Sequence, residues 1–155
     1  MLLELSASGS RSGLFFEDKD LSAVEPFTVI SIKQAEGSIT ELSEFIWDGH
    51  SKNFRLLDNH HAYIWSSVTL YNKEHRALRK QWFDTFINDT QGLPDTSKLY
   101  DFHLSRHSND EAVNLFMQGQ DGLRTVSVTQ VSMQDKHLKM TYNDLLTDNV
   151  KDLIL

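Results

Sequence analysis

The hydrophobic pattern of this chain changes sharply at residue 72, and this change constrains the fold more than any other feature. The run IWSSVTLY at 64–71 is branched and aromatic, whereas NKEHRALRKQWFDTFIN at 72–88 has helical spacing. Its apolar face consists of Leu78, Trp82, Phe83, Phe86 and Ile87. Asn72 is a good N-cap, and Gly92 and Pro94 end the pattern. We predict one main amphipathic helix whose apolar face packs on a sheet.

Short branched and aromatic runs precede this helix. The runs FTVISIK at 27–33, EFIWDG at 44–49 and FRLLD at 54–58 are separated by turn signals near Gly37 and Gly49. This spacing predicts an antiparallel meander. The run at 64–71 would follow either as a fourth strand or as an extended crossing. At the N-terminus, LLEL at 2–5 resembles the end of a helix, and SASGSRSG at 6–13 reads as a loop.

The last third of the chain predicts a second meander. Its strands are AVNLFMQ at 112–118, TVSVTQVSM at 125–133 and LKMTY at 138–142. The apolar positions of the middle strand change parity at Gln130, which predicts a β-bulge. The tail at 143–155 reads as a short helix. The predicted class is α+β, with two antiparallel meanders and one main helix in a single domain of residues 1–155.

Charge and composition exclude several functional classes. The formal net charge is -7, with 22 acidic and 15 basic residues, and the basic residues are scattered, which argues against nucleic-acid binding. No apolar run is long enough to span a bilayer, and no secretion signal opens the chain, so we expect a cytoplasmic protein. There is no cysteine, which removes disulfides, thiolate metal sites and cysteine nucleophiles.

The histidines and tryptophans have plain structural interpretations. His103 and His107 are four residues apart, but no carboxylate accompanies them at a metal-site spacing, so we expect no metal and no cofactor. Trp47, Trp65 and Trp82 are the largest apolar anchors, and we expect them to be core residues.

Ser66 and Ser67 lie where the run at 64–71 gives way to the helix. Small hydroxyl residues at such a corner can serve as a nucleophile or stabilise an oxyanion. They can equally satisfy backbone groups of an ordinary connection. The residues alone favour the second interpretation.

Several segments together resemble a known family. VEPFTVISI at 24–32, HAYIWSSVTLYNKEHRALRKQWFDTFI at 61–87, AVNLFMQGQDGLRTVSVTQVSM at 112–133 and MTYNDLL at 140–146 resemble the C-terminal portion of the NRDE family. That family is related to the transport and Golgi organisation 2 proteins, and the resemblance runs from about Leu2 to Leu146. It implies half of a four-layer αββα sandwich similar to the N-terminal-nucleophile hydrolases. By this resemblance, Ser66, Ser67 and Arg124 would line a cleft.

The family's cysteine after the initiator Met and its Asn-Arg-Asp-Glu motif are both absent from this sequence. Because Met1 and Leu2 offer no nucleophile, we expect no amide hydrolysis by this chain. One hypothesis is a catalytically incomplete C-terminal half of a longer NRDE-type protein, which pairs with its missing N-terminal half or forms a homo-oligomer. The alternative is a non-enzymatic interaction or small-ligand binding domain.

Overall fold

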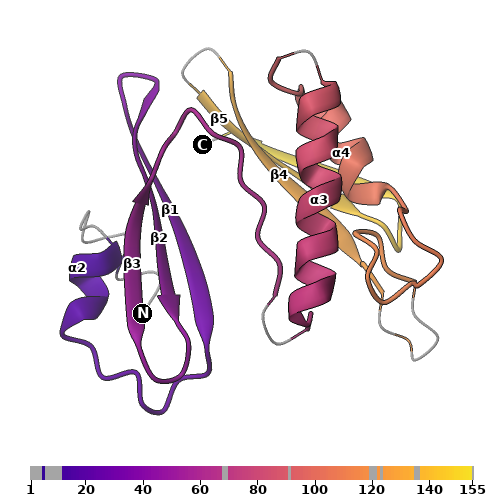
Figure 1. The fold of residues 1–155 in the computed structure, drawn as a ribbon. Helices are drawn as coiled ribbons and strands as arrows, with labels where there is room; N and C mark the ends of the chain where they lie inside the picture. Colours follow the sequence, from indigo (N-terminus) through magenta and orange to yellow (C-terminus); the bar gives the residue numbers. More distant parts are fainter. Residues whose placement is uncertain are drawn as a thin grey trace. The chain divides into compact units, whose positions relative to one another are not determined.

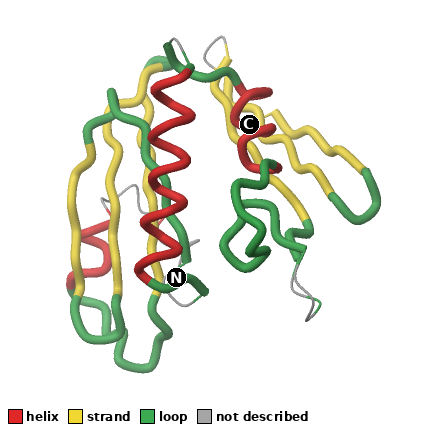
Figure 2. The backbone as a smooth tube through the Cα atoms, turned by 45° about the vertical axis from the view of Figure 1, so that its right-hand side comes forward, coloured by secondary structure: helices red, strands yellow, loops and turns green. Residues whose placement is uncertain are grey.

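The computed structural model describes residues 5, 12–67, 70–90, 92–118, 122, 124–134 and 137–154 (Figure 1). These residues form two three-stranded antiparallel sheets, each with its strands side by side, and one main helix (Figure 2). The predicted α+β class is confirmed. The chain divides into two compact units, Met1–His61 and Ala62–Leu155. The expectation of one domain stays a prediction.

The first unit contains the predicted meander. Its strands are β1 (Phe27–Ala35), β2 (Ser38–Trp47) and β3 (Lys52–Leu57), in the order β1-β2-β3. Gly37 and Gly49 have φ of 80° and 94°, in the left-handed region that favours glycine, and they form the two predicted turns. A register shift between Lys33 and Gln34 adds a bulge that the sequence pattern did not indicate.

A short helix, α2 (Ser12–Glu17), packs on this sheet, and the core of the first unit lies between the helix and the sheet. The predicted loop at 6–13 is therefore wrong at residues 12 and 13, which belong to this helix. Residues 6–11 lie outside the described residues, and so does the LLEL segment apart from Leu5. Gly13 permits the close approach, because a Cβ there would lie 2.6 Å from Cγ of Phe54. The core consists of Phe16, Leu21, Phe45 and Trp47.

The second unit starts with residues 62–67, which are neither helix nor strand. Of the two alternatives for the run at 64–71, a strand is therefore excluded at residues 64–67, 70 and 71, and Val68 and Thr69 lie outside the described residues. The helix α3 (Lys73–Asp89) then begins as predicted, since the Asn72 side chain accepts a hydrogen bond from His75 N at 2.8 Å.

A second helix, α4 (Thr96–Leu104), follows α3 and was not predicted. The Asp95 side chain caps it by accepting a hydrogen bond from Lys98 N at 2.8 Å. The expectation that α3 packs on a sheet is wrong, because its aromatic face packs on α4 and on Leu115. The face is also rotated by one position, with Leu78 exposed and Arg79 buried. Residues 79, 82, 83 and 86 share one side of a helix, so this rotation places Arg79 among the aromatic residues.

The second sheet contains β4 (Ser127–Gln134), β5 (His137–Asp144) and β6 (Asn149–Ile154). The pairing of β4 with β5 is continuous, so the predicted bulge at Gln130 is wrong. The tail forms β6 and not a helix, because Asp144 accepts hydrogen bonds from the backbone N–H groups of Leu146 and Thr147 and closes a hairpin turn.

The run at 112–118 is a compact turn and not a strand. Val113, Asn114, Leu115 and Met117 are all buried, although successive strand residues would point to opposite faces. The run is therefore apolar because it enters the core. Within the part of the chain that the structure describes, no helix is long and apolar enough to cross a membrane.

Candidate ligand pocket

The two serines lie in the connection that leads into α3. The Ser67 hydroxyl accepts a hydrogen bond from Leu70 N at 3.2 Å, and the backbone carbonyl of Ser67 accepts one from Tyr71 N at 3.1 Å. Ser66 is half-buried and Ser67 is exposed. Ser67 thus satisfies backbone groups before the helix, which is the structural role expected from the residues alone.

Arg124 is exposed, and its backbone pairs with Gln118. A chain of contacts connects its segment to the serine connection. The Tyr71 hydroxyl lies 2.9 Å from Met117 Sδ, and Met117 N donates to the Thr125 hydroxyl at 3.0 Å. Ser67 and Arg124 are therefore linked within one unit. That Ser66, Ser67 and Arg124 line a cleft stays a prediction, since neither pocket described below includes them.

The residues immediately before the serines form one wall of a pocket, which we call the Trp65 pocket. Its volume is about 510 Å³. The wall is the segment 62–65, in which the rings of Tyr63 and Trp65 stack with centroids 5.6 Å apart. The expectation that Trp65 is a core residue is wrong, because it is exposed at this wall, whereas Trp47 is buried and Trp82 is half-buried. The other lining residues are Phe83, Ile87, Leu93, Pro94, Leu99 and His103.

Among the described residues that line this pocket, His103 on the last turn of α4 is the only basic one. Its side chain retains solvent access, yet the apolar surroundings lower its pKa below the usual 6.5, and the nearby charge of Arg79 lowers the pKa further. The neutral imidazole is therefore the favoured form near pH 7. A neutral imidazole offers one N–H donor and one acceptor to a ligand.

We expect the free energy of unfolding to fall as the pH falls below about 6.5, the unfolded value for histidine. In this range the unfolded chain binds more protons than the folded chain, because the folded pKa of His103 is lowered. Urea unfolding at pH 7.5 and pH 5.5 measures the effect. The His103→Gln variant should show a weaker pH dependence than the unmodified protein. An identical pH dependence in both proteins would contradict the assignment.

Arg79 lies one helical turn before Phe83 on the same face of α3 and is only 7% exposed. Its guanidinium carbon lies 3.9 Å from the centroid of the Tyr71 ring, and Nη2 donates to the Asn114 carbonyl at 3.3 Å. Nε is buried without a hydrogen-bond partner. Among the described residues, no carboxylate forms an ion pair with Arg79. Within the described part of the chain, a buried cation therefore lies next to the pocket without a counter-ion.

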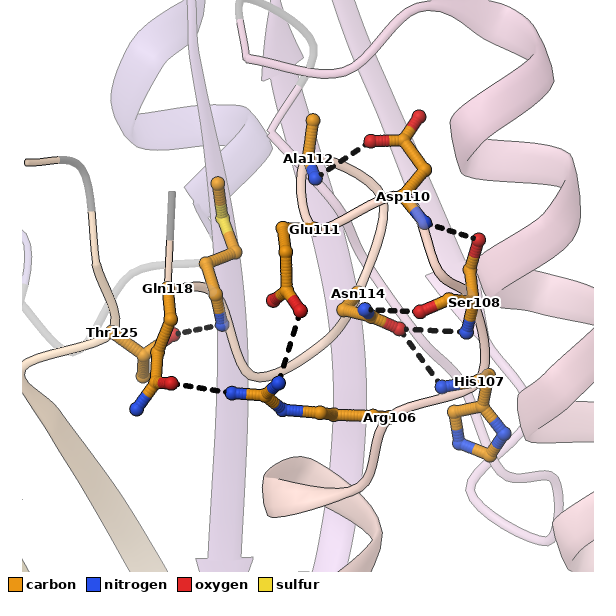
Figure 3. A network of polar contacts seen from close by, with 10 residues as sticks. Arg106, His107, Ser108, Asp110, Glu111, Ala112, Asn114, Gln118 and Thr125 are labelled. Atoms are coloured by element: carbon orange, nitrogen blue, oxygen red, sulfur yellow. Dashed lines mark hydrogen bonds and ion pairs between the residues drawn. The ribbon is translucent and has the colours of Figure 1, made fainter. Parts of the chain in front are cut away.

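The Asn114 side chain organises the loop after α4 (Figure 3). Asn114 is 0% exposed, and its Oδ1 accepts hydrogen bonds from the backbone N–H groups of His107 at 2.8 Å and Ser108 at 3.0 Å. Its Nδ2 donates to the Ser108 carbonyl at 2.8 Å. Arg106 bridges Glu111 and Gln118 beside it. These bonds fix the loop whose Asn114 carbonyl contacts Arg79.

A second, more polar pocket lies between α3 and α4 and has a volume of about 950 Å³. His107 lies in it with its ring stacked on Trp82 at 4.8 Å and its Nε2 2.7 Å from the Ser105 hydroxyl. Burial lowers the pKa of His107. His103 and His107 therefore line different pockets. Among the described residues, no three His, Asp or Glu side chains gather closely enough to hold a metal ion.

Sequence reasoning identified the serine connection but missed the pocket beside it. Trp65 and Leu93 lie in segments without regular structure, which only the structure shows. Comparison of the chain with protein-family models, with curated proteins and with solved structures gives no match.

Proposed function

We propose that this chain is a small-ligand binding protein, that its ligand site is the Trp65 pocket, and that it performs no chemistry on the ligand. A volume of about 510 Å³ lies within the range of roughly 300–1,000 Å³ that small-molecule sites occupy. The lining is aliphatic and aromatic except for a few polar groups, chiefly the His103 imidazole. An apolar wall with one convergent polar group is typical of a site that binds and orients a ligand. That lining is the observation that carries the proposal.

The test is fluorine NMR of the protein labelled with 5-fluorotryptophan, with 4-phenylbutan-1-ol as the probe. The chain has three tryptophans, and each reports a different place. Trp65 lines the pocket, Trp82 lines the second pocket, and Trp47 lies in the core of the first unit. We expect the Trp65 resonance to shift in a saturable manner while the other two stay in place. No shift at Trp65, or equal shifts at all three, would contradict the proposal.

A matched pair of variants localises the binding further. Ile87→Phe adds volume inside the pocket, whereas Leu78→Phe makes a similar change on the same helix at an exposed position outside it. We expect Ile87→Phe to weaken binding by roughly tenfold, about 1.4 kcal/mol, and Leu78→Phe to leave it unchanged. Thermal melting of both variants checks that they are folded. Equal affinities for the two variants would place the ligand elsewhere.

The resemblance to the NRDE family supports a second candidate function, carried by the second sheet. The helix α4 lies on one face of this sheet, where the Gln130 side chain donates to the Thr96 carbonyl at 2.6 Å. The opposite face contains the cross-strand row Val131, Met140 and Leu153, and both ends of this row are exposed. An exposed apolar sheet face is unusual unless a partner covers it.

Under this candidate, the chain is a catalytically incomplete part of an NRDE-type protein, and the intact protein is an amide hydrolase. The partner is a second β-sheet from an N-terminal half that carries the cysteine and the Asn-Arg-Asp-Glu motif. Sheet-on-sheet packing of this kind is what the family's four-layer fold implies. Val131, Met140 and Leu153 would then belong to the buried interface between the sheets.

Light scattering over a dilution series, with and without such an N-terminal half, tests this candidate. Val131→Lys and Val150→Lys are matched variants, because both valines are 61% exposed and lie on opposite faces of the sheet. We expect a one-to-one complex that Val131→Lys abolishes and Val150→Lys preserves. A homodimer that excludes the N-terminal half, or no complex at all, would contradict it.

A further inference from the structure

The buried guanidinium of Arg79 is the feature that the proposed function leaves unexplained. Removing a charged group from water costs several kcal/mol unless a counter-ion and hydrogen bonds compensate. The Arg79 guanidinium lies over the face of the Tyr71 ring and donates one hydrogen bond of 3.3 Å to the Asn114 carbonyl, while its Nε has no hydrogen-bond partner. A cation–π contact replaces only part of the lost hydration. The site is therefore electrostatically incomplete, and the missing charge is negative.

The charge of Arg79 extends to the Trp65 pocket through His103. Arg79 is not itself a lining residue, but it lies close enough to lower the pKa of His103, which lines the pocket. Phe83, one turn after Arg79 on the same helical face, lines the pocket as well. Among the described residues that line it there is no Asp or Glu, and His103 and Tyr63 are the ionisable ones. The charge of Arg79 therefore acts on the His103 end of the pocket.

We propose that the ligand of the Trp65 pocket is a small organic carboxylate with a compact aromatic or branched apolar body. This inference rests on the proposed function. The apolar body packs between the stacked Tyr63 and Trp65 rings and the aliphatic side chains of the opposite wall. The His103 N–H donates to the carboxylate, and the Arg79 charge attracts it. A charge-assisted hydrogen bond is stronger than one to a neutral acceptor.

The experiment compares 4-phenylbutanoate with its neutral analogue 4-phenylbutan-1-ol at pH 7 and low salt, using the Trp65 resonance. The two probes have similar apolar bodies, so their affinity ratio isolates the charge. We expect the carboxylate to bind at least about fivefold more tightly than the alcohol. Equal binding, or tighter binding of the alcohol, overturns the inference and leaves the proposed function standing. If neither probe shifts Trp65, both fail.

Three variants test the role of Arg79. Arg79→Met removes the charge, and a buried cation replaced by an apolar side chain of similar size is commonly neutral or stabilising, so the variant should fold. Its preference for the carboxylate should disappear, and Arg79→Lys should retain part of it. Lys80→Met removes the same charge from an exposed neighbour on the same helix, so it should retain the whole preference. If Arg79→Met and Lys80→Met show the same preference, Arg79 does not act on the ligand.

Discussion

We expect Asn114→Ala to lower the free energy of unfolding by about 3–5 kcal/mol, a large effect for a polar residue in a loop. The Asn114 side chain is 0% exposed and bonds the backbone of His107 once and that of Ser108 twice. Alanine would leave two N–H groups and one carbonyl without partners away from bulk water. Each such group costs roughly 1–3 kcal/mol. Urea unfolding followed by far-ultraviolet circular dichroism measures the loss.

Asn109→Ala is the matched control, because Asn109 is exposed in the same loop and should change stability by no more than about 0.5 kcal/mol. Asn114→Asp tests the geometry more finely. A carboxylate can accept from His107 N and Ser108 N, but only a protonated carboxyl can donate to the Ser108 carbonyl. Relative to the unmodified protein, this variant should gain stability as the pH falls from 7 to 5. The opposite trend would contradict the hydrogen bonds assigned to Asn114.

We expect Phe45→Ala to destabilise the first unit by about 3–5 kcal/mol. Phe45 is 1% exposed, and its ring stacks on Phe16 with centroids 4.5 Å apart, which fixes α2 on the sheet. Alanine would remove a large apolar contact and leave a cavity. Urea unfolding followed by the Trp47 resonance of the fluorotryptophan-labelled protein reports on this unit, because Trp47 belongs to the same core.

Phe54→Ala is the control for this prediction. Phe54 pairs with Phe45 across β2 and β3 on the same face of the sheet, but it is 40% exposed. Its removal creates less of a cavity, so its loss of stability should be clearly smaller. Equal losses for Phe45→Ala and Phe54→Ala would contradict the claim that the buried Phe45 ring contributes more to the stability of the first unit than the more exposed Phe54 ring.

The sequence predicted correctly those elements that depend on the conformational preferences of neighbouring residues. The turn at Gly37, the turn at Gly49 and the N-cap at Asn72 each follow from the conformational preference of one residue, and each is present. The class and the main helix follow from hydrophobic period alone. The Asp95 cap was also a usable signal, so α4 could have been predicted from the sequence.

The errors concern residues whose role depends on distant partners. The run at 112–118 reads as a strand because its composition is apolar, and only contacts formed after folding show that Asn114 is a buried hydrogen-bonding centre. The sequence pattern assigned Leu78 to the core face, whereas Arg79 occupies it. The Arg79 guanidinium lies against the Tyr71 ring and donates a hydrogen bond to the Asn114 carbonyl. Helical spacing places either residue near the core edge, so the pattern could not decide between them.

The candidate site was predicted only in part, for a similar reason. Ser66 and Ser67 lie in the connection before α3, and Trp65 beside them lines a pocket. The opposite wall comes from Leu93, Leu99 and His103, about thirty to forty residues further along the chain. Spacing along the sequence carries no information about that wall. It forms because Asp95 starts α4 and the aromatic face of α3 packs against it.

Isotope-filtered NMR can locate the ligand in the protein directly. The protein would carry labelled Ile and Leu methyl groups, and unlabelled 4-phenylbutanoate would be present at saturation. We expect nuclear Overhauser contacts from the ligand to the methyl groups of Ile87, Leu93 and Leu99, which line the Trp65 pocket. Contacts confined to exposed leucines outside it, such as Leu78 and Leu146, or no contacts at all, would contradict the claim that this pocket is the functional site.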